Sequence, residues 1–556
     1  MKSNENLYPP IRKLILLVIS IVILPHILIA QYDNKLKDEI ILSMKHATKF
    51  FADSISEKGG YLSHYLPDLS RRWGELEAYP TMVWTQNPGT VSMGNTFLDA
   101  YFATNDEYYY LQAKKAANAL KLGQLSCGGW NYFINFDDEN STINWYNTVG
   151  KNAWRLEEFQ HYYGNATFDD ETTSGAAFFL LRFYLTKFDS TIRPPLEAAI
   201  SLILKSQYPL GGWPQRFPLM NDFVKDGHPD YTSYYTFNDN VIWQNIKFLI
   251  ACYSTLPSIQ DFDLVSDQQL IDAIKRGMDF ILLSQQPKPF AGWSQQYNMD
   301  LEPAGARTYE PESLDPQYTA ANIKILLKCY ELTGEKKYLE RIPDAINWLD
   351  EAKLKSTSRE GIFVYAKFVD PKSGKPLFTH RLGTNVNSGH YYVNEDSSKT
   401  PGHYRNFRLI NLKKLKNEYQ NILTLDSEKI ISNSPLFKIY NDNFSLIKKF
   451  DEVTEFLEFS DFDNNTITTS KNMIEKIISA LDDRGRWLVS GLNTSNPYIG
   501  DANDGDSNSK EYMTTNVGDK FDTSPYRDKS DQKYISTAVY SFYMKRLIEY
   551  LKNSEN

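Results

Sequence analysis

The sequence predicts an all-α fold, an α/α toroid whose long loops form a cleft. Apolar residues recur at spacings of three and four from about residue 38 onward, the period of an amphipathic helix. Glycine-aromatic turns recur at Tyr61, Trp130, Trp213 and Trp293, at intervals of 69, 83 and 80 residues. Each interval holds two helices, and such a unit buries its apolar face only against a neighbour. A toroid is favoured over an open solenoid.

The helical period places helices at 38–56, 106–125, 174–187, 236–254, 266–286, 317–333, 338–353, 408–425, 468–482 and 536–553. Ser266 with Gln269 predicts a capping box at the start of one helix, and Gly334 predicts the end of another. The segments 385–406 and 427–467 are richer in Asn, Asp, Ser and Pro, and we predict long loops there. They do not divide the chain into separate cores.

The N-terminus has the order of a signal peptide. Arg12 and Lys13 precede the apolar run 14–24, and Ala30 follows as a small residue. We expect residues 1–30 to be removed on export, leaving 31–556 as one toroid catalytic domain that is secreted or periplasmic. An uncleaved anchor is the alternative, but Pro25 and His26 interrupt the run short of the ~20 apolar residues of a membrane span. No stable membrane insertion is therefore expected.

Composition narrows the class of partner. The net charge is -9, which removes the basic field of a nucleic-acid-binding protein. Aromatic residues make up 14% of the chain, and aromatic faces stack on sugars or fill a wide core. The repeated tryptophans Trp130, Trp213 and Trp293 are predicted mainly as core. Carbohydrate is therefore favoured as a partner over nucleic acid.

Two clusters of oxygen-bearing side chains occur where helices are expected to begin. Asp169 and Asp170 precede one helix, and Asn238 and Asp239 stand at the start of another. Carboxylate and amide oxygens suit Ca²⁺, whose shell of 6–8 oxygens also leaves room for substrate. Helix capping explains the same residues without any metal, and taken alone it is the simpler interpretation. An acidic run from Asp501 resembles a calcium loop, but its glycine is misplaced by one position, so we interpret it as a solvated turn.

Two arginines stand beside Gly and Pro in segments that we interpret as loops. Arg307 and Arg381 could each point a guanidinium into a cleft and pair with a carboxylate. A surface ion pair is the alternative for both.

Five segments, in this order, resemble the motifs of the family 10 pectate lyases: 166–170 (ATFDD), 211–219 (GGWPQRFPL), 236–240 (TFNDN), 306–310 (ARTYE) and 375–383 (KPLFTHRLG). The resemblance covers roughly residues 120–385. It implies an α/α toroid that cleaves polygalacturonate by anti β-elimination, with calcium between enzyme and substrate and an arginine as base.

The resemblance also implies roles for individual residues. Arg381 would be the base, and Asp169 would lie at the scissile site. Calcium would be held by Asp239, Asp170 and Asn238. Arg307 would clamp a substrate carboxylate, with Arg216 and Tyr309 as further substrate-binding residues. The chemistry is consistent, because removing a proton next to a carboxylate creates a dianion that calcium and arginine would stabilise.

Two other functions fit the same sequence. An inverting glycoside hydrolase on an acidic polysaccharide would use Asp169 and Asp239 as its acid and base, at a separation of about 6.5–9.5 Å. A carbohydrate-binding protein without catalysis would use the aromatic residues alone. Elimination gives an unsaturated uronide that absorbs ultraviolet light, and neither alternative does.

Overall fold

The computed structural model describes residues 34–220, 230–259, 262, 264–354, 357–359, 361–383, 389–401, 406–440, 444–459, 469–502 and 517–553. The predicted signal peptide lies outside these ranges, as does most of the acidic run that begins at Asp501. The described residues are mostly helical, which confirms the predicted fold class. Among them, no helix is both long enough and apolar enough to cross a membrane.

A helix over residues 34–50 continues as the π-helix η1 (Phe51–Ile55). The α-helices that follow are α2 (Thr90–Thr104), α3 (Glu107–Gly123), α4 (Glu139–Trp145), α5 (Thr172–Lys187), α6 (Arg193–Ser206), α7 (Val241–Thr255), α8 (Asp267–Leu283), α9 (Pro316–Thr333), α10 (Lys337–Glu340), α11 (Ile342–Glu351), α12 (Leu412–Leu423), α13 (Ser427–Asn433), α14 (Leu446–Leu457), α15 (Lys471–Ser479) and α16 (Thr537–Asn553). The capping box of Ser266 and Gln269 is present at the start of α8, and Gly334 ends α9 with φ 71°, as predicted.

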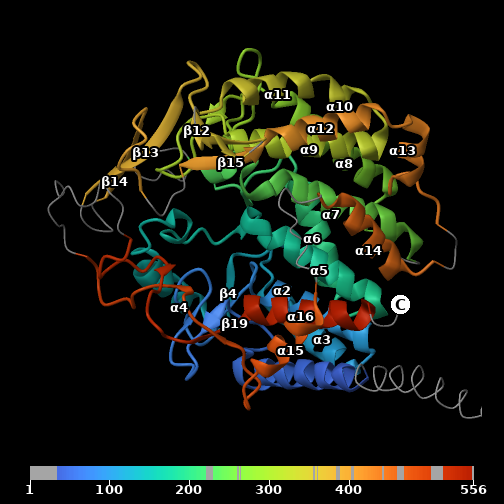
Figure 1. The fold of residues 1–556 in the computed structure, drawn as a ribbon, viewed down its shortest axis with the longest axis vertical. Coiled ribbons are helices and arrows are strands. Elements are labelled where there is room, and N and C mark those ends of the chain that lie inside the picture. The colour runs from blue at the N-terminus through green and yellow to red at the C-terminus, as the bar shows by residue number, and fades with distance from the viewer. Residues whose placement is uncertain are drawn as a thin grey trace, which may run out of the picture.

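Consecutive helices pack in pairs: α2 with α3, α5 with α6, α7 with α8, and α9 with α11. The first helices of successive pairs also pack on one another, because α16, α2, α5 and α7 form a continuous series of contacts. Figure 1 shows the helices stacked through the molecule, with short strands and long loops gathered on one side. These helix pairs are the two-helix units that the repeat predicted.

The glycine-aromatic turns join one helix pair to the next. The indole rings of Trp130, Trp213 and Trp293 are fully buried. Each indole N–H donates a hydrogen bond of 2.8–2.9 Å to a backbone carbonyl in the helix before its turn. The interpretation of these three residues as core is confirmed, and they are not sugar platforms.

Gly211 shows why the turn needs glycine. Its φ is 108°, and a Cβ placed there would lie 2.0 Å from the backbone oxygen of Arg276 in α8. We expect Gly211→Ala to destabilise the fold by at least about 2 kcal/mol, through both the left-handed backbone and the collision with α8. Thermal unfolding measures the loss. Gly518→Ala is the matched control, because its φ is 102° and its nearest described neighbour is an ordinary 3.6 Å away. Equal losses at the two positions would show that the collision with α8 has no effect.

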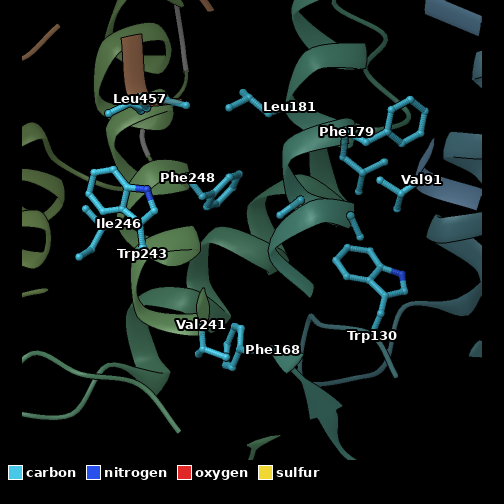
Figure 2. Packing of buried hydrophobic residues seen from close by; sticks show 14 of the residues in the cluster. Val91, Trp130, Phe168, Phe179, Leu181, Val241, Trp243, Ile246, Phe248 and Leu457 are labelled. Carbon is cyan, nitrogen blue, oxygen red and sulfur yellow. The ribbon is translucent and has the colours of Figure 1, made fainter. Parts of the chain in front are cut away.

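The buried core extends between the helix layers. Figure 2 shows Leu181 of α5 on the side toward Phe248 of α7, while Phe179 of α5 lies toward Val91 of α2. The segment 427–467 was predicted as a long loop, and this prediction is wrong for α13 and α14. Helix α14 presents an apolar stripe to α5 and α7, so it belongs to the core.

Short antiparallel strands complete the fold: β1 (His64–Tyr65), β2 (Arg72–Trp73), β3 (Met82–Trp84), β4 (Phe133–Asn135), β5 (Ala166–Thr167), β6 (Arg216–Phe217), β7 (Tyr235–Thr236), β8 (Gln296–Tyr297), β9 (Pro303–Ala304), β10 (Thr357–Arg359), β11 (Ile362–Ala366), β12 (Phe368–Val369), β13 (Pro376–Leu382), β14 (His390–Asn394), β15 (Phe407–Asn411), β16 (Leu488–Val489), β17 (Asn493–Thr494), β18 (Tyr526–Arg527) and β19 (Tyr534–Ser536). The larger sheets have the orders β16-β19-β1-β2, β10-β11-β15 and β12-β13-β14. The sheet β12-β13-β14 shows that two predicted loops are wrong. Arg381 lies on strand β13, and strand β14 lies within the segment 385–406.

Candidate active site

Two equivalent turns bring the acidic residues together. Strand β5 leads through η4 (Asp169–Glu171) into α5, and β7 leads through η6 (Asn238–Asn240) into α7. Asp170 and Asp239 occupy the same place in the two turns, with φ values of 47° and 49°. Because α5 and α7 are neighbours, η4 and η6 are in contact.

Helix capping does not explain these residues. Neither α5 nor α7 has a side-chain hydrogen bond from its N-cap residue, which is Glu171 in one case and Asn240 in the other. The left-handed turns instead leave Asp169, Asp170 and Asp239 close to one another. The capping interpretation of the sequence is wrong.

Asp169 is fully buried at the centre of the group. Its Oδ2 accepts hydrogen bonds from the Tyr132 hydroxyl at 2.7 Å and from Arg307 Nη2 at 3.0 Å. Burial by itself would raise the pKa of Asp169, but Arg307 and hydrogen bonds from Asp239 and Tyr132 hold it below its ordinary value. Asp169 is therefore the member of the group that carries the negative charge.

The neighbouring carboxylates behave in the opposite way. Burial, followed by repulsion from Asp169 and Asp170, raises the pKa of Asp239 well above its ordinary value. Burial and the charge of Asp169 likewise raise the pKa of Asp170, whose Oδ2 accepts a hydrogen bond of 2.7 Å from Gln86. Packing three carboxyl groups together without a cation favours the protonated form of two of them.

Both the nitrogen and the oxygen of the Asn238 side-chain amide form hydrogen bonds. Its Nδ2 donates to Asp239, and its Oδ1 accepts a hydrogen bond of 2.9 Å from the Tyr318 hydroxyl. The same hydroxyl accepts a hydrogen bond of 2.9 Å from the backbone N–H of Asp239. Asn238 thus orients Asp239 and would have to give up Tyr318 to offer its oxygen fully to a metal.

Arg307 lies in the loop between β9 and α9, and it is buried instead of forming a surface ion pair. Its guanidinium contacts three carboxylates: Glu158 at 3.0 Å, Asp169 at 3.0 Å and Glu310 at 3.4 Å. Burial alone would lower the pKa of Arg307, but Glu158 and Glu310 raise it well above its ordinary value. Arg307 is a permanent cation that anchors the site.

Lys367 is a second buried cation near Arg307. Its Nζ lies 3.9 Å from Glu310, and Glu310 also contacts Arg307. Burial lowers the pKa of Lys367 to about 8, although Glu310 and Asp315 oppose the shift. Two cations therefore share Glu310.

The two predicted substrate-binding residues Arg216 and Tyr309 are buried. The Arg216 guanidinium lies over the rings of Tyr132 and Tyr163, at 5.2 and 4.5 Å from their centroids. The Tyr309 ring meets the edge of Tyr391 at a centroid distance of 5.2 Å. Both side chains are packed among aromatic rings, and neither lines the cavity beside the Arg307 loop.

Arg381 stands on the β13–β14 side of the site. Its guanidinium lies 3.8 Å from the centroid of the Trp154 ring and is hydrogen-bonded to the hydroxyl of Tyr391, its cross-strand partner. Thr379, on the same strand, donates a hydrogen bond of 3.1 Å to the backbone carbonyl of Tyr309. The β-hairpin therefore leans against the loop that carries Arg307.

Sequence reasoning missed two acidic members of the site. Glu158 follows α4 and pairs with Arg307, and Glu75 comes from the turn after β2, far outside the recognised motifs. Burial, with repulsion from Glu158 and Asp169, raises the pKa of Glu75 to about 8. Neither residue has a periodic or motif signal, because each reaches the site only through the packing of a loop.

A cavity of about 650 Å³ opens beside the Arg307 loop. Its lining includes Tyr234, Arg307, Thr308, Glu310 and Lys372. The volume lies within the usual range of ligand sites. Of the predicted site residues, Arg307 lines this cavity, while Asp169, Asp239 and Arg381 lie outside its lining.

The acidic group has the chemistry of a cation site. Asp169 Oδ1 is buried and accepts no hydrogen bond from an N–H or hydroxyl of a described residue, while the Asp239 carboxyl is within hydrogen-bonding reach of Asp169. Two carboxyl groups so placed share either a proton or a cation. Across the described ranges, no group of three or more His, Cys, Asp or Glu side chains is placed so that it could hold a metal ion by itself. Water or substrate oxygens would have to complete a calcium shell.

Part of the chain that carries this site is similar to a known family. Residues 142–398 match the family model described as pectic acid lyase, and no curated protein matches the chain. Among solved structures, the chain is similar to a family 10 polysaccharide lyase from Cellvibrio cellulosa, with 18% identity, 60% of this chain and 98% of that chain covered, and a TM-score of 0.39. A mutant family 10 polysaccharide lyase from the same organism was solved in complex with trigalacturonic acid.

The chain is also similar to the α-1,6-mannanase GH76A from Salegentibacter sp. HEL1_6, with 9% identity, 94% of this chain and 100% of that chain covered, and a TM-score of 0.34. The family model spans Asp169, Asp239, Arg307 and Arg381 alike. Residues 142–398 of this protein, a little less than half of the chain, are therefore similar to the pectic acid lyase family.

Proposed function

We propose that the protein cleaves α-1,4-linked polygalacturonate by calcium-assisted anti β-elimination, with Arg381 as the base. The observation that carries this proposal is the buried group of Asp169, Asp170 and Asp239 next to the fixed cation Arg307. Such a group is costly unless a second cation joins it, and a polyanionic substrate requires positive charge. An inverting hydrolase would instead need a carboxyl pair about 6.5–9.5 Å apart with a water between them, whereas Asp239 lies within hydrogen-bonding reach of Asp169.

Asp169, Asp170 and Asp239 would hold the calcium ion, with Asn238 as a further oxygen donor. When bound, calcium would supply positive charge that stabilises the carboxylate of the uronate under attack. Residues of the chain itself would bind and orient the substrate. Glu158 and Glu310 fix the Arg307 guanidinium. Its nitrogens make four hydrogen bonds to these two carboxylates and to that of Asp169. The second N–H of Nη2 would donate to a substrate carboxylate.

Arg381 would accept the proton from C5 of the uronate, after which the bond between C4 and the glycosidic oxygen breaks. Its position supports this role in two ways. The side chain is buried, so few waters compete for it. Arg155 is a second guanidinium close to Tyr391, the hydrogen-bond partner of Arg381. A like charge nearby favours the neutral form that a base needs.

The decisive experiment is incubation with polygalacturonate, with and without a chelator, followed by ultraviolet absorbance. We expect an absorbing unsaturated product that disappears on chelation and returns with added Ca²⁺. Asp239→Ala should lose most of this activity and keep its helical circular dichroism, because Asp239 is not a capping residue. New reducing ends that form without an increase in ultraviolet absorbance would indicate a hydrolase. Full activity after thorough chelation would exclude a role for calcium.

We also propose that this activity operates outside the cytoplasm, on the basis of the N-terminal pattern of residues 1–30. N-terminal sequencing of the exported protein should find a chain that begins near Gln31. Recovery of the protein with Met1 in place, tightly bound to membranes, would support the anchor instead.

A further inference from the structure

The Arg381 guanidinium is held between two aromatic side chains. It lies 3.8 Å from the centroid of the Trp154 ring and forms a hydrogen bond with the hydroxyl of Tyr391. The Tyr391 and Trp154 rings also lie beside each other, with centroids 6.2 Å apart and an angle of 31° between their planes. Arg381 is 2% exposed and Trp154 is 7% exposed. The indole of Trp154 is therefore a buried platform for the guanidinium that we propose as the base.

Helix packing does not explain this indole. Among the described residues, the tryptophans of the glycine-aromatic turns all lie in the main hydrophobic core, whereas Trp154 lies outside it. Trp154 instead forms a small separate cluster with Ala502, and Tyr391, Val517 and Phe521 pack against this cluster. The cluster joins the indole to the Arg381 side of the site and to the C-terminal part of the chain.

The loop that carries Trp154 is also hydrogen-bonded to the C-terminal part of the chain. Thr523 donates from its backbone N–H to the Asn152 carbonyl at 3.2 Å and from its hydroxyl to the Val149 carbonyl at 2.5 Å. Asn152 donates from its side-chain Nδ2 to the Asp501 carboxylate at 3.2 Å. These bonds fix the backbone directly before Trp154, and the apolar cluster holds the side chain.

The support for Trp154 comes from outside the region that matches the pectic acid lyase family. That region ends at residue 398, whereas the supporting residues lie in 501–502 and 517–524. The second segment is closed on itself around Asp522, which is fully buried. The backbone N–H groups of Ser524 and Gly518 donate to its carboxylate at 2.8 and 3.1 Å. Residues 517–524 thus form a fixed support for the loop.

We propose that Trp154 is a positioning residue for Arg381, and that 501–502 and 517–524 keep Trp154 in place. A base must lie at the proton that it removes, and a displacement of about 1 Å can lower the rate about 100-fold. A flat ring fixes the plane of a guanidinium stacked on it. Stacking also favours the charged form, so Trp154 acts through position and not by making the guanidine neutral. This inference rests on the proposed function for the catalytic role of Arg381.

The kinetic test compares Trp154→Leu and Trp154→Phe with the wild type on polygalacturonate. Trp154→Leu should lower kcat about 10-fold to 100-fold and change KM less, because a misplaced base acts mainly on the transition state. Trp154→Phe should recover most of the loss, since it keeps a flat ring. Phe521→Ala should lower kcat by a smaller factor without changing either member of the stacked pair. Trp487→Leu is the control: Trp487 is buried in the main core, so its loss should lower the melting temperature and leave kcat unchanged well below it.

A double-mutant cycle separates positioning from a general structural role. In a protein that already carries Arg381→Ala, Trp154→Leu should cause no further loss of kcat, because the group that it positions is gone. Losses that multiply in the double variant would overturn the inference. A folded Trp154→Leu protein with normal kcat would overturn it as well.

Chemical modification of Arg381 tests the positioning without relying on activity. Phenylglyoxal reacts with accessible guanidine groups, and mass spectrometry of the resulting peptides gives the rate at each arginine. We expect Trp154→Leu and Phe521→Ala to raise the rate at Arg381 several-fold, with no change at Arg276, an exposed arginine of α8. An unchanged rate at Arg381 in both folded variants would overturn the inference. Absence of unsaturated product from the wild type would overturn the proposed elimination, while the modification rates would still decide whether Trp154 holds Arg381.

Discussion

Arg381→Ala should lower kcat on polygalacturonate by about 100-fold to 10,000-fold, the usual contribution of a positioned general base. KM should change less, because a base acts mainly in the transition state. Arg381→Lys should not restore the rate, because an ammonium cannot keep the position of the guanidinium over Trp154 and against Tyr391. Initial rates from ultraviolet absorbance, with melting temperatures beside them, measure the effect.

The pH dependence of the reaction rate is a second test of Arg381 as the base. A guanidine that must lose a proton makes the rate climb beyond neutral pH, since its deprotonated fraction rises about tenfold per pH unit below the pKa. We expect an alkaline optimum at fixed free calcium. Lys375→Ala is the matched control: Lys375 directly precedes β13, but its exposed side chain pairs with Glu395 at 2.7 Å. A near-normal kcat in Arg381→Ala would move the base elsewhere, with Arg216 the next candidate.

Arg307→Met should destabilise the protein by about 3–5 kcal/mol, the cost of removing one partner from a buried ion pair. It leaves Glu158, Asp169 and Glu310 facing one another without their common cation. Activity should fall through both KM and kcat, because a carboxylate clamp acts in the ground state and in the transition state. Thermal unfolding and steady-state kinetics measure the two effects.

The loss of stability should depend on pH in a definite direction. Burial already raises the pKa of Glu158, and Arg307 opposes that shift. Without Arg307 the folded pKa rises further above the unfolded value, so the folded state binds more protons and loses stability as the pH increases. The deficit of Arg307→Met should therefore be small near pH 4 and large at pH 7.

Arg182→Met is the control for Arg307→Met. Arg182 also pairs with two carboxylates, Asp99 at 2.6 Å and Asp451 at 3.9 Å, but their side chains are 42% and 51% exposed. Pairs of this kind contribute about 0–1 kcal/mol. Equal losses in the two variants, or a deficit in Arg307→Met that does not change with pH, would show that burial of the three carboxylates is not the cause.

Some features of the site follow from the repeat, and others do not. Asp170 and Asp239 could be predicted as neighbours because they occupy equivalent turns before adjacent helices. Glu75 and Glu158 could not, because their loops have no periodicity and reach the site only through long-range packing. The environment of Arg381 was also missed: its segment has Gly and Pro nearby, yet pairing with β14 makes it a strand.

By itself the sequence determined the helical class, the pairing of helices by the glycine-aromatic turns and the set of residues that resembles a lyase. These are local properties, since helical period, capping and the need for glycine at positive φ depend on neighbours in the chain. Only the tertiary structure decided how the charges are arranged. It engaged Arg307 with three carboxylates and packed α14 against α5 and α7. Charge pairing and burial depend on atoms brought together from hundreds of residues apart, which no local pattern records.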